Sequence, residues 1–218
     1  ENPQSILVVC GCSAENHRLE LEDLGIDILI GNKDKSNIVS LIWEYQNDHK
    51  PIIKFYDTRK LPFEDMKVDK FTSHTRGFIK IQDGCNNYCS YCIIPYVRGN
   101  IRSKDINVAL KEAQKLVANN HKEIVLTGIH TGSYGVGYDF DLVDLINKMS
   151  TIPGLKRIRL SSIEITELND KFMELLKNNT ILYGLKGITR VTEPVINEIM
   201  MNRPFSSLQD FLNRTNSR

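Results

Sequence analysis

The sequence predicts an α/β protein in which two parallel-sheet units precede a short α-helical tail. Two observations lead to this expectation. Short, continuous apolar runs such as residues 26–30 are typical of strands buried on both faces, and they alternate with segments in which apolar residues recur at helical spacing. A strand–helix–strand order requires a crossover connection and therefore favours parallel pairing. A charged stretch containing Pro62, residues 58–75, is expected to link the two units.

The first unit is predicted over residues 1–57. Its strands and helices alternate, with strands expected at 5–10, 26–30 and 51–55 and with helices that end near residues 24 and 45. Gly25 is expected to end the first helix, and Ser36 is expected to cap the start of the second.

The second unit is predicted over residues 76–180 as three consecutive βα repeats. The strands are expected at 77–82, 123–127 and 156–160, and the helices at 104–119, 141–149 and 169–177. Ser103 is expected to cap the first of these helices. Functional sites in such folds gather where parallel strands end, and three polar loops follow the three strands: 84–99, 128–133 and 161–164. Residues 181–218 break the repeat and are predicted to form a helical tail.

The composition restricts the classes of protein to consider. The 218 residues carry a net charge of +1 with 41% hydrophobic and 25% charged residues, which suits a soluble fold and gives no overall sign of nucleic-acid binding. No apolar run approaches ~20 residues, so we expect no membrane span. The five cysteines come without an export signal, which favours a reducing, cytoplasmic location.

Three cysteines in the loop 84–99 carry the main chemical signal. Cys85, Cys89 and Cys92 follow a Cys-x3-Cys-x2-Cys spacing, which lets three thiolates hold a 4Fe–4S cluster and leaves its fourth iron open to a small molecule. A structural zinc site would need a fourth ligand, and no histidine lies within fifteen residues after Cys92. Disulfides fit poorly, because the cysteines cluster instead of spreading as a framework.

The residues around these cysteines resemble the radical S-adenosylmethionine (SAM) tRNA methylthiotransferases. The text Cys85-x3-Cys89-x-Tyr91-Cys92 is similar to the signature of the radical SAM superfamily. Residues 72–99, 126–135 and 159–164 resemble the branch that acts on threonylcarbamoyladenosine, and the resemblance covers about residues 3–178. It implies a truncated Rossmann- or flavodoxin-like N-terminal domain followed by a partial parallel (βα) radical SAM barrel.

The resemblance implies that the protein adds a methylthio group to C2 of N6-threonylcarbamoyladenosine at position 37 of tRNA. The cluster on the three cysteines would cleave SAM reductively, and the 5′-deoxyadenosyl radical would take hydrogen from C2. The implied partners are the anticodon loop of tRNA and an electron donor such as flavodoxin or ferredoxin. The implied SAM-binding residues are Tyr91, Gly128, Ser161 and Ser162, although a glycine also serves as a strand-ending turn and serines commonly cap helices.

Cys12 matches the last of three cysteines that hold a second cluster in this family. The other two are absent from this chain, so we expect no second 4Fe–4S cluster and an incomplete enzyme. Cys10 is expected to be a buried apolar residue within its strand.

The sequence gives only a weak indication that the protein binds RNA. Arg98 and Arg102 flank the cysteine loop, and Tyr88 and Tyr96 lie between basic residues, as on a surface that grips a backbone and stacks bases. A solvated rim is an equally good interpretation of the same charges.

Residues 181–214 resemble a helix-hairpin-helix segment of bacterial DNA polymerase III alpha subunits. The matching stretches are 183–188 and 203–212, whereas Arg190 and Thr192 stand where the turn glycines are expected. We therefore expect a chimeric chain joined near residue 180. Two alternatives to the enzyme stay open, namely a non-catalytic iron–sulfur or nucleic-acid-binding fragment and a DNA-binding module formed by the tail.

Overall fold

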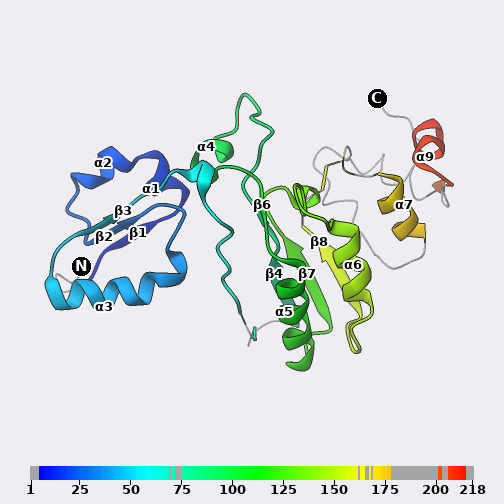
Figure 1. Ribbon diagram of the computed structural model, residues 1–218, viewed down its shortest axis with the longest axis horizontal. Coiled ribbons are helices and arrows are strands. Elements are labelled where there is room, and N and C mark those ends of the chain that lie inside the picture. The colour runs from blue at the N-terminus through cyan, green and yellow to red at the C-terminus, as the bar shows by residue number, and fades with distance from the viewer. Residues whose placement is uncertain are drawn as a thin grey trace. The chain divides into compact units, whose positions relative to one another are not determined.

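The computed structural model describes residues 5–68, 70–71, 75–161, 163–164, 167, 169–177, 201–202 and 206–214. The chain groups into two compact units, residues 1–66 with 84–101 and residues 67–83 with 102–218. Each unit contains a three-stranded parallel sheet (Figure 1), which confirms the predicted α/β class. No helix in the part of the chain that the structure describes combines the length and the apolar character needed to cross a bilayer.

The first unit is built on strands β1 (Val8–Cys10), β2 (Ile28–Ile30) and β3 (Ile52–Lys54), paired in that order. Helices α1 (Cys12–Asn16) and α2 (Arg18–Glu22) follow β1, and α3 (Ile38–Asp48) follows β2. Two 3-10 turns complete it, η1 (Lys35–Asn37) and η2 (Thr58–Lys60). The loop 84–101, with helix α4 (Ile94–Arg98), belongs to the same unit.

Helices cover both faces of this sheet. Ile28 and Ile30 of β2 pack with Leu41 of α3, whereas Leu29 packs with Ala14 of α1. Because side chains alternate along a strand, an apolar residue at every position of β2 requires cover on both faces.

The predicted cap at Ser36 is wrong. Ser36 lies inside η1, where its backbone N–H and its hydroxyl both donate to Glu64 Oε1, at 2.8 and 2.9 Å. Asn37 stands at the cap position of α3 and makes no side-chain capping bond. The Ser36 hydroxyl is therefore occupied by a distant carboxylate, and a sequence pattern for capping cannot reveal such a partner.

The second unit contains strands β4 (Arg76–Lys80), β7 (Glu123–Thr127) and β8 (Arg157–Leu160) in the order β4-β7-β8. Its helices are α5 (Ile106–Ala118), α6 (Leu142–Ser150), α7 (Asp170–Lys177) and α9 (Leu208–Arg214), with the turn η3 (Thr131–Ser133) after β7. Apolar residues of the three strands form one core with α5, α6 and α7. The three predicted βα repeats are thus present in this unit.

The strand expected at 77–82 is divided, and this changes the start of the next helix. After β4, the two residues of β5 (Gln82–Asp83) pair antiparallel with β6 (Arg102–Ser103). Ser103 is therefore not a helix cap, and its hydroxyl accepts a hydrogen bond from Gly135 N at 2.9 Å. Asp105 caps α5 instead, because its carboxylate accepts from the N–H groups of Asn107 and Val108.

Candidate functional site

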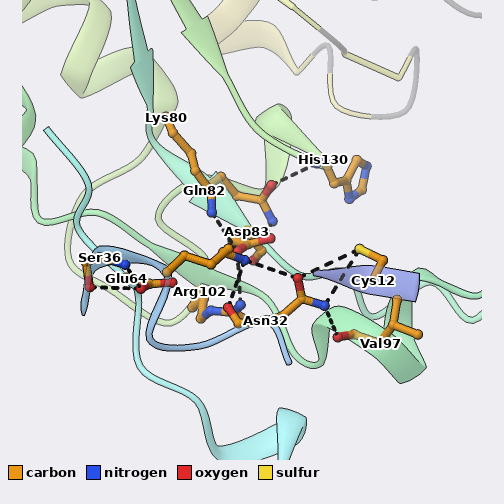
Figure 2. A network of polar contacts seen from close by, with 11 residues as sticks. Cys12, Asn32, Ser36, Glu64, Lys80, Gln82, Asp83, Val97, Arg102 and His130 are labelled. Carbon is orange, nitrogen blue, oxygen red and sulfur yellow. Dashed lines mark hydrogen bonds and ion pairs between the residues drawn. The ribbon is translucent and has the colours of Figure 1, made fainter. Parts of the chain in front are cut away.

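A buried ion pair joins the two ends of the cysteine loop. Asp83 ends β5, Arg102 begins β6, and the two residues face each other in the antiparallel ladder. The Asp83 carboxylate, on a side chain 3% exposed, accepts from Arg102 Nη2 at 3.0 Å and from Lys80 Nζ at 2.7 Å (Figure 2). Both charged groups of the Asp83–Arg102 pair are buried. Their attraction offsets the free-energy cost of removing the two charges from water.

Backbone contacts continue the closure into the loop. Cys85 N donates to Gly99 O at 3.1 Å, and Ile101 N donates to Asn86 Oδ1 at 3.0 Å. Gly84 has a φ of 73°, and a Cβ atom at this position would collide with the Asn100 carbonyl. The residue before Cys85 must therefore be glycine for the two ends of the loop to approach each other.

The three predicted cluster ligands all belong to this closed loop. Cys89 is exposed, Cys85 and Cys92 are half-buried, and none of the three forms a disulfide. Three free thiols in one loop match the donor chemistry of an open 4Fe–4S cluster. Within the described ranges, however, no three His, Cys, Asp or Glu side chains lie close enough to hold a metal ion. The thiols would have to draw together to share a cluster.

Tyr91 stands between the second and third cysteines with its side chain 82% exposed. Its ring is available to a ligand, as the predicted packing against the SAM adenine requires. That role stays a prediction.

Cys12 lies in a different environment, beside a buried asparagine. Asn32, 3% exposed, donates from Nδ2 to the carbonyl of Val97 in α4 at 2.6 Å, and its amide lies 3.6 to 3.8 Å from Cys12 Sγ (Figure 2). One amide thus links the Cys12 thiol to the helix that closes the cysteine loop. Cys10 is exposed, so the expectation of a buried residue there is wrong.

The second unit brings other predicted residues together where its parallel strands end. Gly128 directly follows β7, and a Cβ atom there would lie 2.8 Å from Gln82 Oε1, the same oxygen that accepts from His130 N at 2.8 Å (Figure 2). The Ser161 hydroxyl, after β8, lies 3.2 Å from the Thr131 hydroxyl. Ser162 lies outside the described residues. The geometry explains Gly128 by close packing, and SAM contacts for these residues stay predictions.

A histidine–glutamate pair at this edge was not singled out from the sequence. His130 Nε2 lies 2.6 Å from Glu167 Oε1, His130 Nδ1 lies 2.6 Å from the Ser133 hydroxyl, and the histidine and glutamate side chains are 13% and 12% exposed. The Glu167 carboxylate beside it raises the pKa of His130 above its ordinary value. The signal available in the sequence was that His130, a polar residue, comes shortly after the buried strand β7. Its partner Glu167 follows a different strand, β8, so the pair itself could not be predicted.

The two predicted RNA-binding arginines differ in burial and in their surroundings. Arg98 ends α4 and is half-buried. Arg102 is 7% exposed and pairs with Asp83, an arrangement unlike that of a phosphate-binding arginine on a surface. RNA contact by these residues stays a prediction.

The polymerase-like hairpin of the tail falls mostly outside the described residues, including Arg190 and Thr192. Within the described part, helix α9 begins at Leu208, inside the predicted helical tail. Asp210 accepts from the backbone N–H and the hydroxyl of Ser206.

Comparison with known sequences places this loop in a wider family. The sequence profile of the Radical SAM superfamily matches residues 79–214. The match includes the cysteine loop and continues past residue 178, where the resemblance was expected to end.

Several curated proteins are similar to the chain. It is 41% identical over 180 residues to the threonylcarbamoyladenosine tRNA methylthiotransferase MtaB of Bacillus subtilis, covering 81% of this chain and 40% of that protein. It is 32% identical over 227 residues to the Aquifex aeolicus protein of the same name, covering 95% and 55%. It is 29% identical over 228 residues to a tRNA-2-methylthio-N(6)-dimethylallyladenosine synthase of Clostridium tetani, covering 99% and 49%. The chain therefore spans about half the length of these relatives.

Proposed function

Because the chain belongs to the radical SAM superfamily, we propose that it is the cluster-binding part of a tRNA methylthiotransferase. Its substrate would be N6-threonylcarbamoyladenosine at position 37 of tRNA, methylthiolated at C2. The observation that carries the proposal is the Cys85–Cys89–Cys92 loop inside a chain 41% identical to a protein named for that activity.

The proposal extends to the finer architecture. The helices on both faces of β1-β2-β3 support a Rossmann- or flavodoxin-like first unit. The three parallel βα repeats of the second unit support part of a radical SAM barrel. Cys12 is the one cysteine that matches a predicted ligand of the second cluster, and one thiolate cannot hold a cluster, so we do not propose a second cluster on this chain alone.

The cysteines would hold a 4Fe–4S cluster, which supplies an electron for the reductive cleavage of SAM when both are bound. The Asp83–Arg102 pair fixes the two ends of the loop that presents the thiols. Tyr91 offers an exposed ring for the SAM adenine, and the Ser161 hydroxyl is held near Thr131. A flavodoxin or ferredoxin would deliver the electron, and the anticodon loop of tRNA would present the base.

Anaerobic reconstitution with iron and sulfide tests the proposal. We expect about four irons per chain, and 5′-deoxyadenosine after addition of SAM and a reductant. The variant with Cys85→Ala, Cys89→Ala and Cys92→Ala should lose both signals. Cys10→Ala is the matched control, because this exposed thiol lies outside the loop, and it should retain both. Iron that persists in the triple variant would contradict the assignment.

A further inference from the structure

We infer that Tyr88 and Tyr96 form a platform on which unpaired bases of the RNA substrate stack. The inference rests on the proposed function and adds to it a surface for single-stranded RNA on the cysteine loop. We call these two residues the tyrosine platform.

The tyrosine platform is an aromatic pair that remains open to solvent. The two ring centroids lie 5.8 Å apart with an angle of 83° between the ring planes, so the rings pack edge to face. Tyr88 is nevertheless 49% exposed and Tyr96 is 63% exposed. Exposed aromatic faces held in a fixed mutual geometry suit base stacking, because every base presents a π-face.

The backbone on either side of the platform is held in place. Thr58 Oγ1 donates to the carbonyl of Tyr96 at 3.0 Å, and Asn100 Nδ2 donates to the carbonyl of Arg59 at 3.1 Å. Tyr88 has a φ of 45°, in the left-handed region that a side chain with a Cβ atom rarely adopts. Residues kept in such conformations cluster at ligand-binding sites. The Thr58 contact holds the backbone of Tyr96, which limits the entropy lost when a base stacks on this ring.

The charges around the platform favour RNA as the occupant. Residues 84–101 contain Arg98 and no aspartate or glutamate. The adjoining turn η2 carries Arg59 and Lys60, whose side chains are 71% and 84% exposed, and Asp57 is the carboxylate that pairs with both. Three basic groups against one acid attract a phosphate backbone, while the tyrosine rings offer surfaces for bases. An acidic protein surface would interact with the basic groups alone. A purely apolar protein surface would interact with the tyrosine rings alone.

Binding of a fluorescently labelled anticodon stem–loop RNA to the chain tests the inference. Tyr88→Leu and Tyr96→Leu are each expected to raise the Kd about 5- to 160-fold, which is the range for losing one stacked base. Tyr88→Phe and Tyr96→Phe should stay within about twofold, because phenylalanine preserves the stacking face. The matched control is Tyr138→Leu in the second unit, where a tyrosine 52% exposed packs on Phe140 at 5.0 Å, and it should leave the Kd unchanged.

Several results would overturn the inference. They are an unchanged Kd in both leucine variants, an equal loss in the phenylalanine variants, and a chain that binds no RNA at all. A changed oligomeric state of the leucine variants without a changed Kd would identify a protein interface instead. Circular dichroism melts of each variant verify that the fold is intact. Iron content and 5′-deoxyadenosine formation need no RNA, so they report separately on the proposed function.

Discussion

Replacing Arg102 by methionine is expected to destabilise the second unit by about 3 kcal/mol. The guanidinium lies 3.0 Å from the Asp83 carboxylate, and the two side chains are 8% and 3% exposed. Methionine keeps most of the buried volume but removes the charge. The variant therefore leaves a buried carboxylate that still contacts Lys80 Nζ, at 2.7 Å.

The magnitude follows from two opposing effects. Two unit charges 3.0 Å apart attract by roughly 5 kcal/mol at an effective dielectric constant of about 20. In the variant, Lys80 still offsets part of the negative charge of Asp83, because its ammonium contacts the same carboxylate oxygen, Oδ2. Breaking a buried pair from one side costs about 3 to 5 kcal/mol, and Lys80 places this pair at the lower end.

Urea unfolding followed by circular dichroism measures the loss. Arg59→Met is the control, since this guanidinium also pairs with an aspartate but is 71% exposed, and it should leave the stability close to that of the wild type because solvent screens the pair. Adding Asp83→Asn to Arg102→Met should cost less than the sum of the two single changes. If Arg102→Met retained wild-type stability and instead weakened RNA binding, the argument for a buried structural pair would be wrong.

Two other substitutions test contacts near the candidate site. Asn32→Ala should destabilise the first unit by about 2 kcal/mol, because it leaves the Val97 carbonyl without its amide donor, and urea unfolding measures the change. His130→Gln tests the pair with Glu167 through pH. Since the folded pKa of His130 is raised, its stabilisation is complete below the unfolded pKa of about 6.5 and is lost as pH rises through the folded pKa. The difference in Tm between wild type and variant should therefore be largest at about pH 6 and shrink at higher pH, and a difference that grows with pH would contradict the pairing.

The accuracy of the sequence predictions depended on how local each signal was. The apolar runs located β2 and β7 closely, because burial on both faces leaves a continuous pattern in the strand itself. The cap of α5 was placed at Ser103 instead of Asp105, because both residues are favoured at caps and the intervening pairing of β5 with β6 has no local signal.

Contacts between side chains that are distant in the sequence could not be predicted from such local patterns. Asn32 bonds to Val97, and His130 pairs with Glu167. Neither contact leaves a periodic pattern, because each joins loops or helix ends that follow different strands.

The sequence by itself determined the spacing of Cys85, Cys89 and Cys92, the order of strands and helices, and the parallel pairing that this order requires. Only the tertiary structure decided which charged residues are buried. Arg102 looks like any basic residue beside a loop until the antiparallel register sets it opposite Asp83. Spacing along the chain records local geometry, whereas burial and charge compensation depend on residues that the fold brings together across the cysteine loop.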